Sequence, residues 1–210
     1  MDDVQPQVAV GWPDQTLIAD DGSEGRAYSD EELAREARQR PAAFGELYRR
    51  HLQKVYRYLL ARVGNVQDAQ DLTSQTFMAA LEGIGRYDGR GHFAAWLLGI
   101  ARHKLVDHFR RDSAPLPLEA VGQMAHPGEG LEEAVEWQLR VERLALALRA
   151  LAPDRAEALA LRLFGRLAPA EVAQVMGKSE AAVRMLTHRA VRDLQDRLAP
   201  ITDMEVENER

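Results

Sequence analysis

The 210-residue chain contains no cysteine, which excludes disulfide-stapled scaffolds and zinc sites that depend on thiolates. No apolar run approaches the roughly 18 residues that a membrane-spanning helix requires. The first thirty residues are acidic and have no apolar segment, so they do not have the pattern of a signal peptide. Together these absences predict a soluble protein of the reducing cytoplasm, without membrane insertion.

Residues of strong β-propensity are also few, and aromatic residues make up only 6% of the chain. Alanine, leucine, arginine and glutamate dominate instead, and all four favour helices. A hydrophobic content of 46% is enough to fill real cores, and the length suits one large domain or two small ones. We therefore expect an all-α protein.

The chain shows no constellation of catalytic or metal-binding residues. Its histidines lack the spacing of metal ligands, and no glycine-rich phosphate loop precedes a helix and a lysine. The six histidines are His51, His92, His103, His108, His126 and His188. We expect no cofactor, no bound metal and no enzymatic activity in this chain.

Charge is distributed unevenly along the sequence. The formal net charge is −6, but residues 1–36 carry −8 and residues 203–210 carry −3, which leaves +5 on residues 37–202. A basic body between two acidic ends is typical of nucleic-acid-binding proteins. Arginine outnumbers lysine by 24 to three; arginine suits phosphate and guanine, although a GC-rich genome produces the same bias.

Hydrophobic periodicity and capping residues predict two groups of helices. Asp30 is a candidate N-cap for the first helix, and the Gly64-Asn65 pair ends the second. The expected helices cover 31–40, 43–63, 68–84, 93–111, 131–151, 154–164, 169–176 and 180–198.

Stretches rich in glycine, proline and acids separate these groups. We expect two small helical domains, joined by a flexible linker. The expected boundaries are 1–41 for an acidic, disordered leader with a short helix, 42–112 for the first domain, 113–136 for the linker, 137–198 for the second domain, and 199–210 for an acidic tail.

Residues 169–188 match the helix-turn-helix pattern. The small Ala173 stands where two helix backbones approach closely, and Gly177 stands in the turn, where a positive φ is needed. Pro169 opens the first helix and Ser179 caps the second. The positions that seal the two helices hold Val172, Met176, Val183 and Leu186. The outer face of the second helix, which enters the major groove in this class, then carries Arg184, Met185, His188 and Arg189. A three-helix domain that does not bind DNA fits the same pattern.

Several stretches resemble the extracytoplasmic-function (ECF) sigma factors of the sigma-70 superfamily. They are FGELYRR at 44–50, DAQDLTSQTF at 68–77, YDGRGHF at 87–93, WL at 96–97, IARH at 100–103, LAPDR at 151–155, SEAAVR at 179–184 and HRA at 188–190. The resemblance covers about 42–112 and 137–198, in the order and spacing of the family.

The resemblance implies a subunit that gives RNA polymerase its choice of promoter. The first domain, like sigma region 2, would bind the polymerase clamp and open the minus-ten element. The second, like region 4, would bind the minus-35 element through its helix-turn-helix. The implied partners are the polymerase core and promoter DNA. Family members are often held by an anti-sigma factor, so one is a candidate partner.

The resemblance also assigns residues to each surface. The polymerase-binding candidates are Asp68, Asp71, Gln75 and Met78, although acids there also suit a solvated helix face. The minus-ten candidates are Arg86, Tyr87, Arg90, His92, Phe93, His103, Asp107 and Arg110, with Arg102 and Lys104 adding charge. Tyr87, His92 and Phe93 would offer stacking surfaces to unpaired bases. Phe93 and Trp96 also suit the core, where we place Trp96.

Two departures from the family pattern affect promoter sequence. His103 stands where an asparagine is common, and Met185-Leu186 replaces the usual Ser-Arg pair. The promoter motifs of other members therefore cannot be transferred to this chain.

Two other functions fit parts of the sequence. A dimeric helix-turn-helix regulator would bind a closed, palindromic duplex without polymerase. An anti-sigma or adaptor protein with a vestigial helix-turn-helix would support no promoter-dependent transcription.

Overall fold

The computed structural model describes residues 28–89, 92–112 and 131–207, and these residues form eight α-helices and one short 3-10 helix. The all-α prediction is confirmed. Most of the expected leader, and the linker over 113–130, lie outside the described residues.

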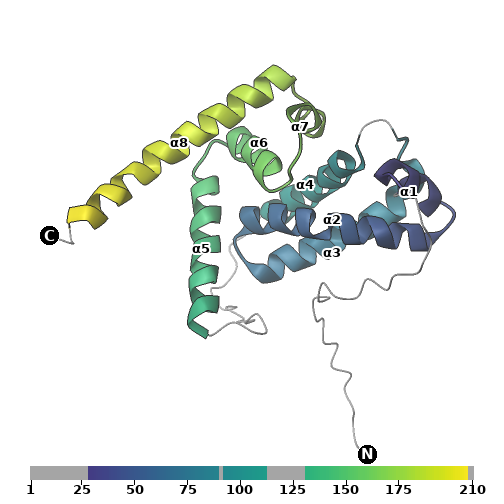
Figure 1. The fold of residues 1–210 in the computed structure, drawn as a ribbon, viewed down its shortest axis with the longest axis horizontal. Helices are drawn as coiled ribbons and strands as arrows, with labels where there is room; N and C mark the ends of the chain where they lie inside the picture. The colour runs from purple at the N-terminus through teal and green to yellow at the C-terminus, as the bar shows by residue number, and fades with distance from the viewer. Residues whose placement is uncertain (1–27, 90–91, 113–130, 208–210) are drawn as a thin grey trace, which may run out of the picture.

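The first group of helices forms a compact bundle (Figure 1). It consists of α1 (Asp30–Ala37), α2 (Pro41–Val63), α3 (Val66–Gly83), the 3-10 helix η1 (Ile84–Arg86) and α4 (Phe93–Asp112). Between α2 and α3 the chain reverses at Gly64, whose φ of 81° suits glycine. Asn65 then caps α3, because its side chain accepts a 2.8 Å hydrogen bond from the Asp68 amide.

The N-cap of α1 is Ser29 and not Asp30, so that prediction is wrong. Ser29 accepts a hydrogen bond from the Glu32 amide, and the Glu32 carboxylate accepts one from the Ser29 amide. This reciprocal pair satisfies two amides at the helix start. It leaves the Asp30 carboxylate to accept a 2.6 Å hydrogen bond from the imidazole of His51 on α2.

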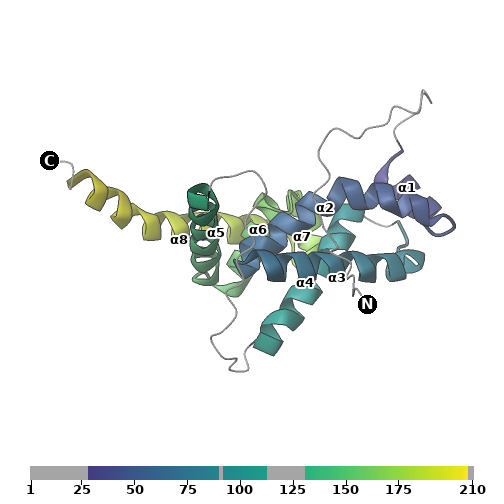
Figure 2. The ribbon, with the colours of Figure 1, turned by 90° about the horizontal axis from the view of Figure 1, so that it is seen from below.

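The second group of helices contains the expected helix-turn-helix. It consists of α5 (Leu131–Arg149), α6 (Pro153–Leu163), α7 (Pro169–Met176) and α8 (Glu180–Glu207). The last helix is longer than predicted, because it continues through Pro200 and beyond the expected end at 198. A proline removes one backbone hydrogen bond and can kink a helix without ending it. In both ribbon views the C-terminal half of α8 extends away from the rest of the molecule (Figures 1 and 2).

The two groups pack directly against each other. Helix α5 contacts the end of α2, and α7 contacts α4. Apolar side chains of both groups, including Leu97 and Leu98 from α4 and Leu161 and Val172 from α6 and α7, belong to one continuous buried cluster. Helix α4, which carries the expected minus-ten surface, therefore lies against α7, the first helix of the helix-turn-helix.

Acidification is expected to destabilise the contact between α1 and α2. Burial lowers the pKa of His51 from its ordinary value of 6.5, and the nearby Lys54 and Arg50 add to this, while Asp30 acts in the opposite direction. The neutral ring donates through Nε2 to Asp30, and its buried Nδ1 has no hydrogen-bond partner among the described residues. Adding a second proton to the ring, at the buried Nδ1, would therefore be unfavourable.

Because the folded state binds this proton more weakly than the unfolded state, stability should fall as the pH drops through 6.5. Each unit of difference between the two pKa values corresponds to about 1.4 kcal/mol. The measurement is thermal unfolding at about pH 7.5 and about pH 5.5. His51→Gln is the matched control, because glutamine keeps a donor for Asp30 and does not titrate. An equal loss of stability in both proteins would contradict the assignment.

Candidate nucleic-acid and partner interfaces

The helix-turn-helix has the geometry that its sequence predicts. Pro169 stands in the first turn of α7, and Gly177 ends that helix with a φ of 63°. Ser179 starts the next helix, where its hydroxyl accepts a 3.2 Å hydrogen bond from the Ala182 amide. Val172 and Val183 are fully buried between the helices. Backbone conformation, capping and packing all hold α8 in one orientation relative to α7.

The predicted reading face of α8 is exposed. Arg184, Met185, His188 and Arg189 all point outward. The Arg184 side chain is 69% exposed and forms an ion pair with Glu180, one turn earlier on the same helix. Met185 is 49% exposed, which is high for a large apolar side chain. Leu186, in contrast, is half-buried.

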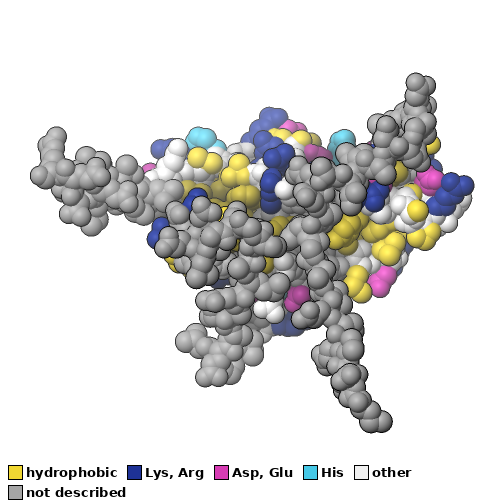
Figure 3. Space-filling view, turned by 60° about the horizontal axis from the view of Figure 1, so that its bottom comes forward, with side chains coloured by type: hydrophobic (Ala, Val, Ile, Leu, Met, Phe, Trp, Pro, Cys, Tyr) yellow, Lys and Arg dark blue, Asp and Glu magenta, His cyan; other side chains and the backbone are white. Residues whose placement is uncertain are grey.

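The outer face of α4 carries several of the polar residues that the sequence assigns to minus-ten recognition. His103 is exposed, and Asp107 forms a 3.1 Å ion pair with Arg110 near the exposed end of the helix. Arg86 and His92 are exposed on the segment that precedes α4, whereas Arg90 lies outside the described residues. Lysine and arginine side chains are spread over both halves of the face shown in Figure 3, with hydrophobic side chains between them.

Tyr87 and Phe93 are not available as stacking surfaces in this structure, contrary to the sequence expectation. Tyr87 is 4% exposed and Phe93 is 1% exposed, whereas a base needs an open ring face. The two rings meet edge to face at 5.6 Å, and both contact Trp96. Arg38, the residue that follows α1, donates a hydrogen bond to the carbonyl of Tyr87. These rings anchor the loop, and the expected core position of Trp96 fits this cluster.

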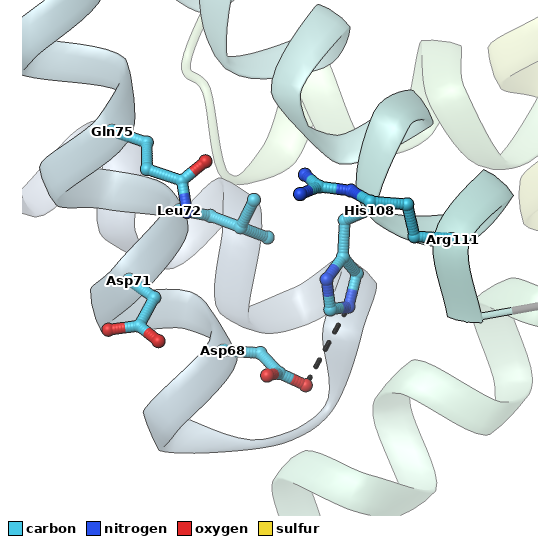
Figure 4. Close-up of a pocket in the computed structure, with 6 residues that line it drawn as sticks. All are labelled: Asp68, Asp71, Leu72, Gln75, His108 and Arg111. Atoms are coloured by element: carbon cyan, nitrogen blue, oxygen red, sulfur yellow. Dashed lines mark ion pairs between the residues drawn. The ribbon is translucent and has the colours of Figure 1, made fainter. Parts of the chain in front are cut away.

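The polymerase-binding candidates lie on one side of α3, beside α4. A shallow cleft between the two helices is lined by Asp68, Asp71, Leu72, Gln75, His108 and Arg111 (Figure 4). The imidazole of His108 points towards Asp68, with 3.6 Å between Nε2 and the nearer carboxylate oxygen. Met78, one turn further along α3, is 64% exposed. The four candidates therefore lie along one side of α3. Three of them carry an acidic or amide group, and the fourth is an exposed apolar side chain.

The sequence prediction missed His108 and Arg111. Both lie near the C-terminal end of α4, and they reach the cleft because α3 and α4 pack side by side. Their spacing of three residues places them on one helical face, which is a usable sequence signal. The partner face on α3 could be identified only from the packing.

No helix among the described residues is both long and apolar enough to cross a membrane. Within the same residues, no group of three or more histidines and carboxylates is placed to hold a metal ion.

Comparison with protein families gives two matches that follow the two groups of helices. Residues 47–114 match sigma-70 region 2, and residues 141–194 match sigma-70 region 4. The first match includes the α3–α4 cleft, and the second includes the helix-turn-helix. The chain belongs to the sigma-70 family, and its relatives place it among the ECF sigma factors.

Those relatives include the ECF RNA polymerase sigma factor BldN of Streptomyces coelicolor, which is 42% identical over 162 residues. That match covers 75% of this chain but only 61% of BldN. The RNA polymerase sigma factor YlaC of Bacillus subtilis is 30% identical, over 71% of this chain and 88% of YlaC. Among solved structures, CnrH in complex with the cytosolic domain of CnrY has a TM-score of 0.66 and 25% identity, over 81% of this chain and 97% of CnrH.

Proposed function

We propose that this sigma factor divides promoter recognition between its two groups of helices and docks on polymerase through α3. The exposed face of α8 would bind the minus-35 element, and the outer face of α4 would bind the minus-ten element. The observation that carries the proposal is the helix-turn-helix, in which a left-handed Gly177 and two buried valines turn Arg184 and Arg189 towards solvent. Catalysis would belong to polymerase, and this chain would act in the cytoplasm as its specificity subunit.

The two DNA surfaces have different chemistry. The face of α8 offers two arginines and a histidine around an exposed methionine, which combines base-edge donors with an apolar contact for a thymine methyl group. The proposed minus-ten surface consists of Arg86, Arg90, His92, His103, Asp107 and Arg110. Tyr87 and Phe93 support this surface from the core instead of stacking on bases.

The α3–α4 cleft is the proposed contact with the polymerase clamp. Asp68, Asp71 and Gln75 face the cleft, and Met78 extends the surface with an apolar side chain. Carboxylates that face a partner protein do not repel the DNA phosphates, which the basic surfaces elsewhere would contact. A regulatory protein that sequesters the sigma factor is a further candidate partner, because the similar CnrH structure is a complex with a second protein.

Arg184 and Arg189 are expected to act differently on the minus-35 element. Arg184 stands near the start of α8, where side chains of a recognition helix reach base edges, whereas Arg189 lies more than a turn further on. An arginine that binds guanine with two hydrogen bonds discriminates by about 1–3 kcal/mol, while a phosphate contact adds affinity without sequence information. Arg184→Ala should relax the preference at one or two positions, and Arg189→Ala should weaken all sequences alike.

The measurement is binding of the holoenzyme to a library randomised in the upstream element, at two salt concentrations. Arg189→Ala should also flatten the salt dependence by about one unit, as expected for the loss of one phosphate contact. Glu180→Gln is a useful comparison, because it removes the ion partner of Arg184 and leaves the arginine in place. An unchanged sequence preference in Arg184→Ala would contradict the assignment of this face.

A further inference from the structure

Helix α1 lies beside the loop between η1 and α4, called here the minus-ten loop, whose described residues are 87–89 and 92. The helix precedes residue 47, where the match to sigma-70 region 2 begins. It nevertheless contacts both α2 and α4. Three of its side chains are buried in the core cluster that also contains Tyr87 and Phe93, namely Leu33, Ala34 and Ala37. The packing of α1 is therefore continuous with the rings at the two ends of the loop.

The end of α1 holds the start of the minus-ten loop. Arg38 donates a hydrogen bond from its guanidinium group to the carbonyl of Tyr87, the residue at which η1 ends. The Tyr87 amide in turn donates a 3.2 Å hydrogen bond to the carbonyl of Ile84. A donor that carries a full charge forms a stronger hydrogen bond than a neutral one. The position of the chain at Tyr87 is therefore set from α1 as well as from η1.

The start of α1 holds the other end of the loop, through α2. The Asp30 carboxylate accepts the hydrogen bond from His51, and the His51 ring packs on Phe93 with 5.3 Å between the ring centroids. Arg50 fixes this end of α1 to α2, because it donates to the Tyr28 carbonyl and to Asp30. Phe93 is the first residue of α4 and directly follows the loop. One helix thus restrains the chain on both sides of the minus-ten loop.

A third contact reaches a side chain of the loop. Glu31 on α1 lies 3.9 Å from Nδ1 of His92, the residue before α4. The His92 side chain is 71% exposed, and ion pairs between exposed side chains contribute little. We therefore expect this contact to matter less than the hydrogen bond from Arg38.

We propose that α1 is a brace for the minus-ten loop, made of Asp30, Glu31 and Arg38, and that Arg38 is its main positioning residue. The role rests on the proposed function, in which the loop meets the minus-ten element. Arg38 acts through the Tyr87 carbonyl, and so through the direction in which Arg86 and the loop project from η1.

The loop needs such a brace because its middle is little confined. Gly89 has a φ of 73°, and a Cβ added to it would meet nothing within 4 Å among the described residues. Glycine is also the residue with the greatest conformational freedom in an unrestrained chain. A loop that is ordered before binding loses less freedom when it binds. Contacts at its two ends therefore supply the order that packing around Gly89 does not.

Hydrogen exchange of the free, full-length protein tests the brace without promoter DNA. Arg38→Met removes the donor but keeps an aliphatic stem, which preserves the packing of a long side chain. It should speed exchange of the Tyr87 amide by about tenfold, as expected for the loss of one hydrogen bond with a charged donor. Arg35→Met, which removes the same charge from an exposed position of α1, should not. Unchanged exchange in Arg38→Met would overturn the brace.

Promoter opening tests the positioning role of Arg38. In the holoenzyme, Arg38→Met should leave affinity for core polymerase unchanged and lower permanganate reactivity of the minus-ten thymines by about tenfold. Arg38→Lys keeps a charged donor and should recover part of the reactivity, and Glu31→Gln should have a smaller effect than Arg38→Met. A matching loss of core affinity, or an equal loss of reactivity in Arg35→Met, would overturn the role of Arg38.

A double variant distinguishes failure of the brace from failure of the proposed function. Arg86→Ala combined with His92→Ala removes two proposed DNA contacts and leaves the Arg38 contact with Tyr87 in place. Full reactivity in this double variant would remove the loop from the minus-ten surface, and with it the proposed function of this segment. Lost reactivity in the double variant, with normal reactivity in Arg38→Met, would show that the loop meets DNA and would overturn only the brace.

Discussion

Replacing Asp71 by arginine is expected to weaken binding to core polymerase by about tenfold or more, which corresponds to at least about 1.4 kcal/mol. Asp71 is exposed on α3 and lines the cleft together with Gln75 and Arg111. A reversed charge would repel the basic partner that this acidic surface is expected to meet, and juxtaposed like charges at interfaces are strongly unfavourable. The fold should be preserved, because exposed substitutions usually change stability by only about 0.5 kcal/mol.

The measurement is titration of labelled sigma factor with core polymerase. Asp196→Arg is the matched control, since it makes the same change of charge on an exposed part of α8. A loss of affinity in both variants would indicate a general effect of net charge. Unchanged affinity in Asp71→Arg would remove this side of α3 from the polymerase interface.

Replacing Phe93 by alanine is expected to cost about 3–5 kcal/mol of unfolding free energy. The ring is 1% exposed and packs against Tyr87, Trp96 and His51, with ring centroids 5.3–5.6 Å apart. Its removal would leave a cavity at the base of α4 and free the loop that carries His92. Chemical denaturation followed by circular dichroism measures the loss, and Tyr48→Ala, which truncates a 40% exposed ring, is the comparison.

Phe93→Leu separates a core role from a stacking role. Leucine retains much of the buried volume but offers no aromatic face. If Phe93 is only a core residue, Phe93→Leu should fold and still open the minus-ten element, as detected by permanganate reactivity of unpaired thymines. Normal holoenzyme assembly with lost reactivity would show that the ring leaves the core to stack on a base.

The local features of the fold could be predicted from the sequence because each depends on a few neighbouring residues. Gly177 and Ser179 fix the turn of the helix-turn-helix whatever surrounds them, and the period of apolar residues fixes which side of α8 is exposed. The ends of the helices were predicted less accurately. Ser29 and Asp30 are both good capping residues, and the glutamate three positions after Ser29, which completes a capping box, was the local signal that the prediction overlooked.

Features that depend on contacts between distant segments could not be predicted in this way. Phe93 follows a glycine-rich loop and could equally be exposed or buried, until the positions of Tyr87 and Trp96 are known. Likewise, Glu157 reads as one of several charged residues on an amphipathic helix. Its burial against Tyr58 arises only from the packing of the two groups of helices, which no periodicity encodes.

Run-off transcription tests the central claim most directly. Purified protein is added to core polymerase with a library of genomic promoter fragments, and the start sites of the transcripts are mapped. The account predicts transcripts that require the added protein and start downstream of a shared pair of elements near minus-ten and minus-35. The run-off signal should fall with Asp71→Arg, and the upstream preference should broaden with Arg184→Ala. Specific binding to closed duplex DNA with no polymerase-dependent transcript would contradict the sigma role and favour a regulator that acts alone.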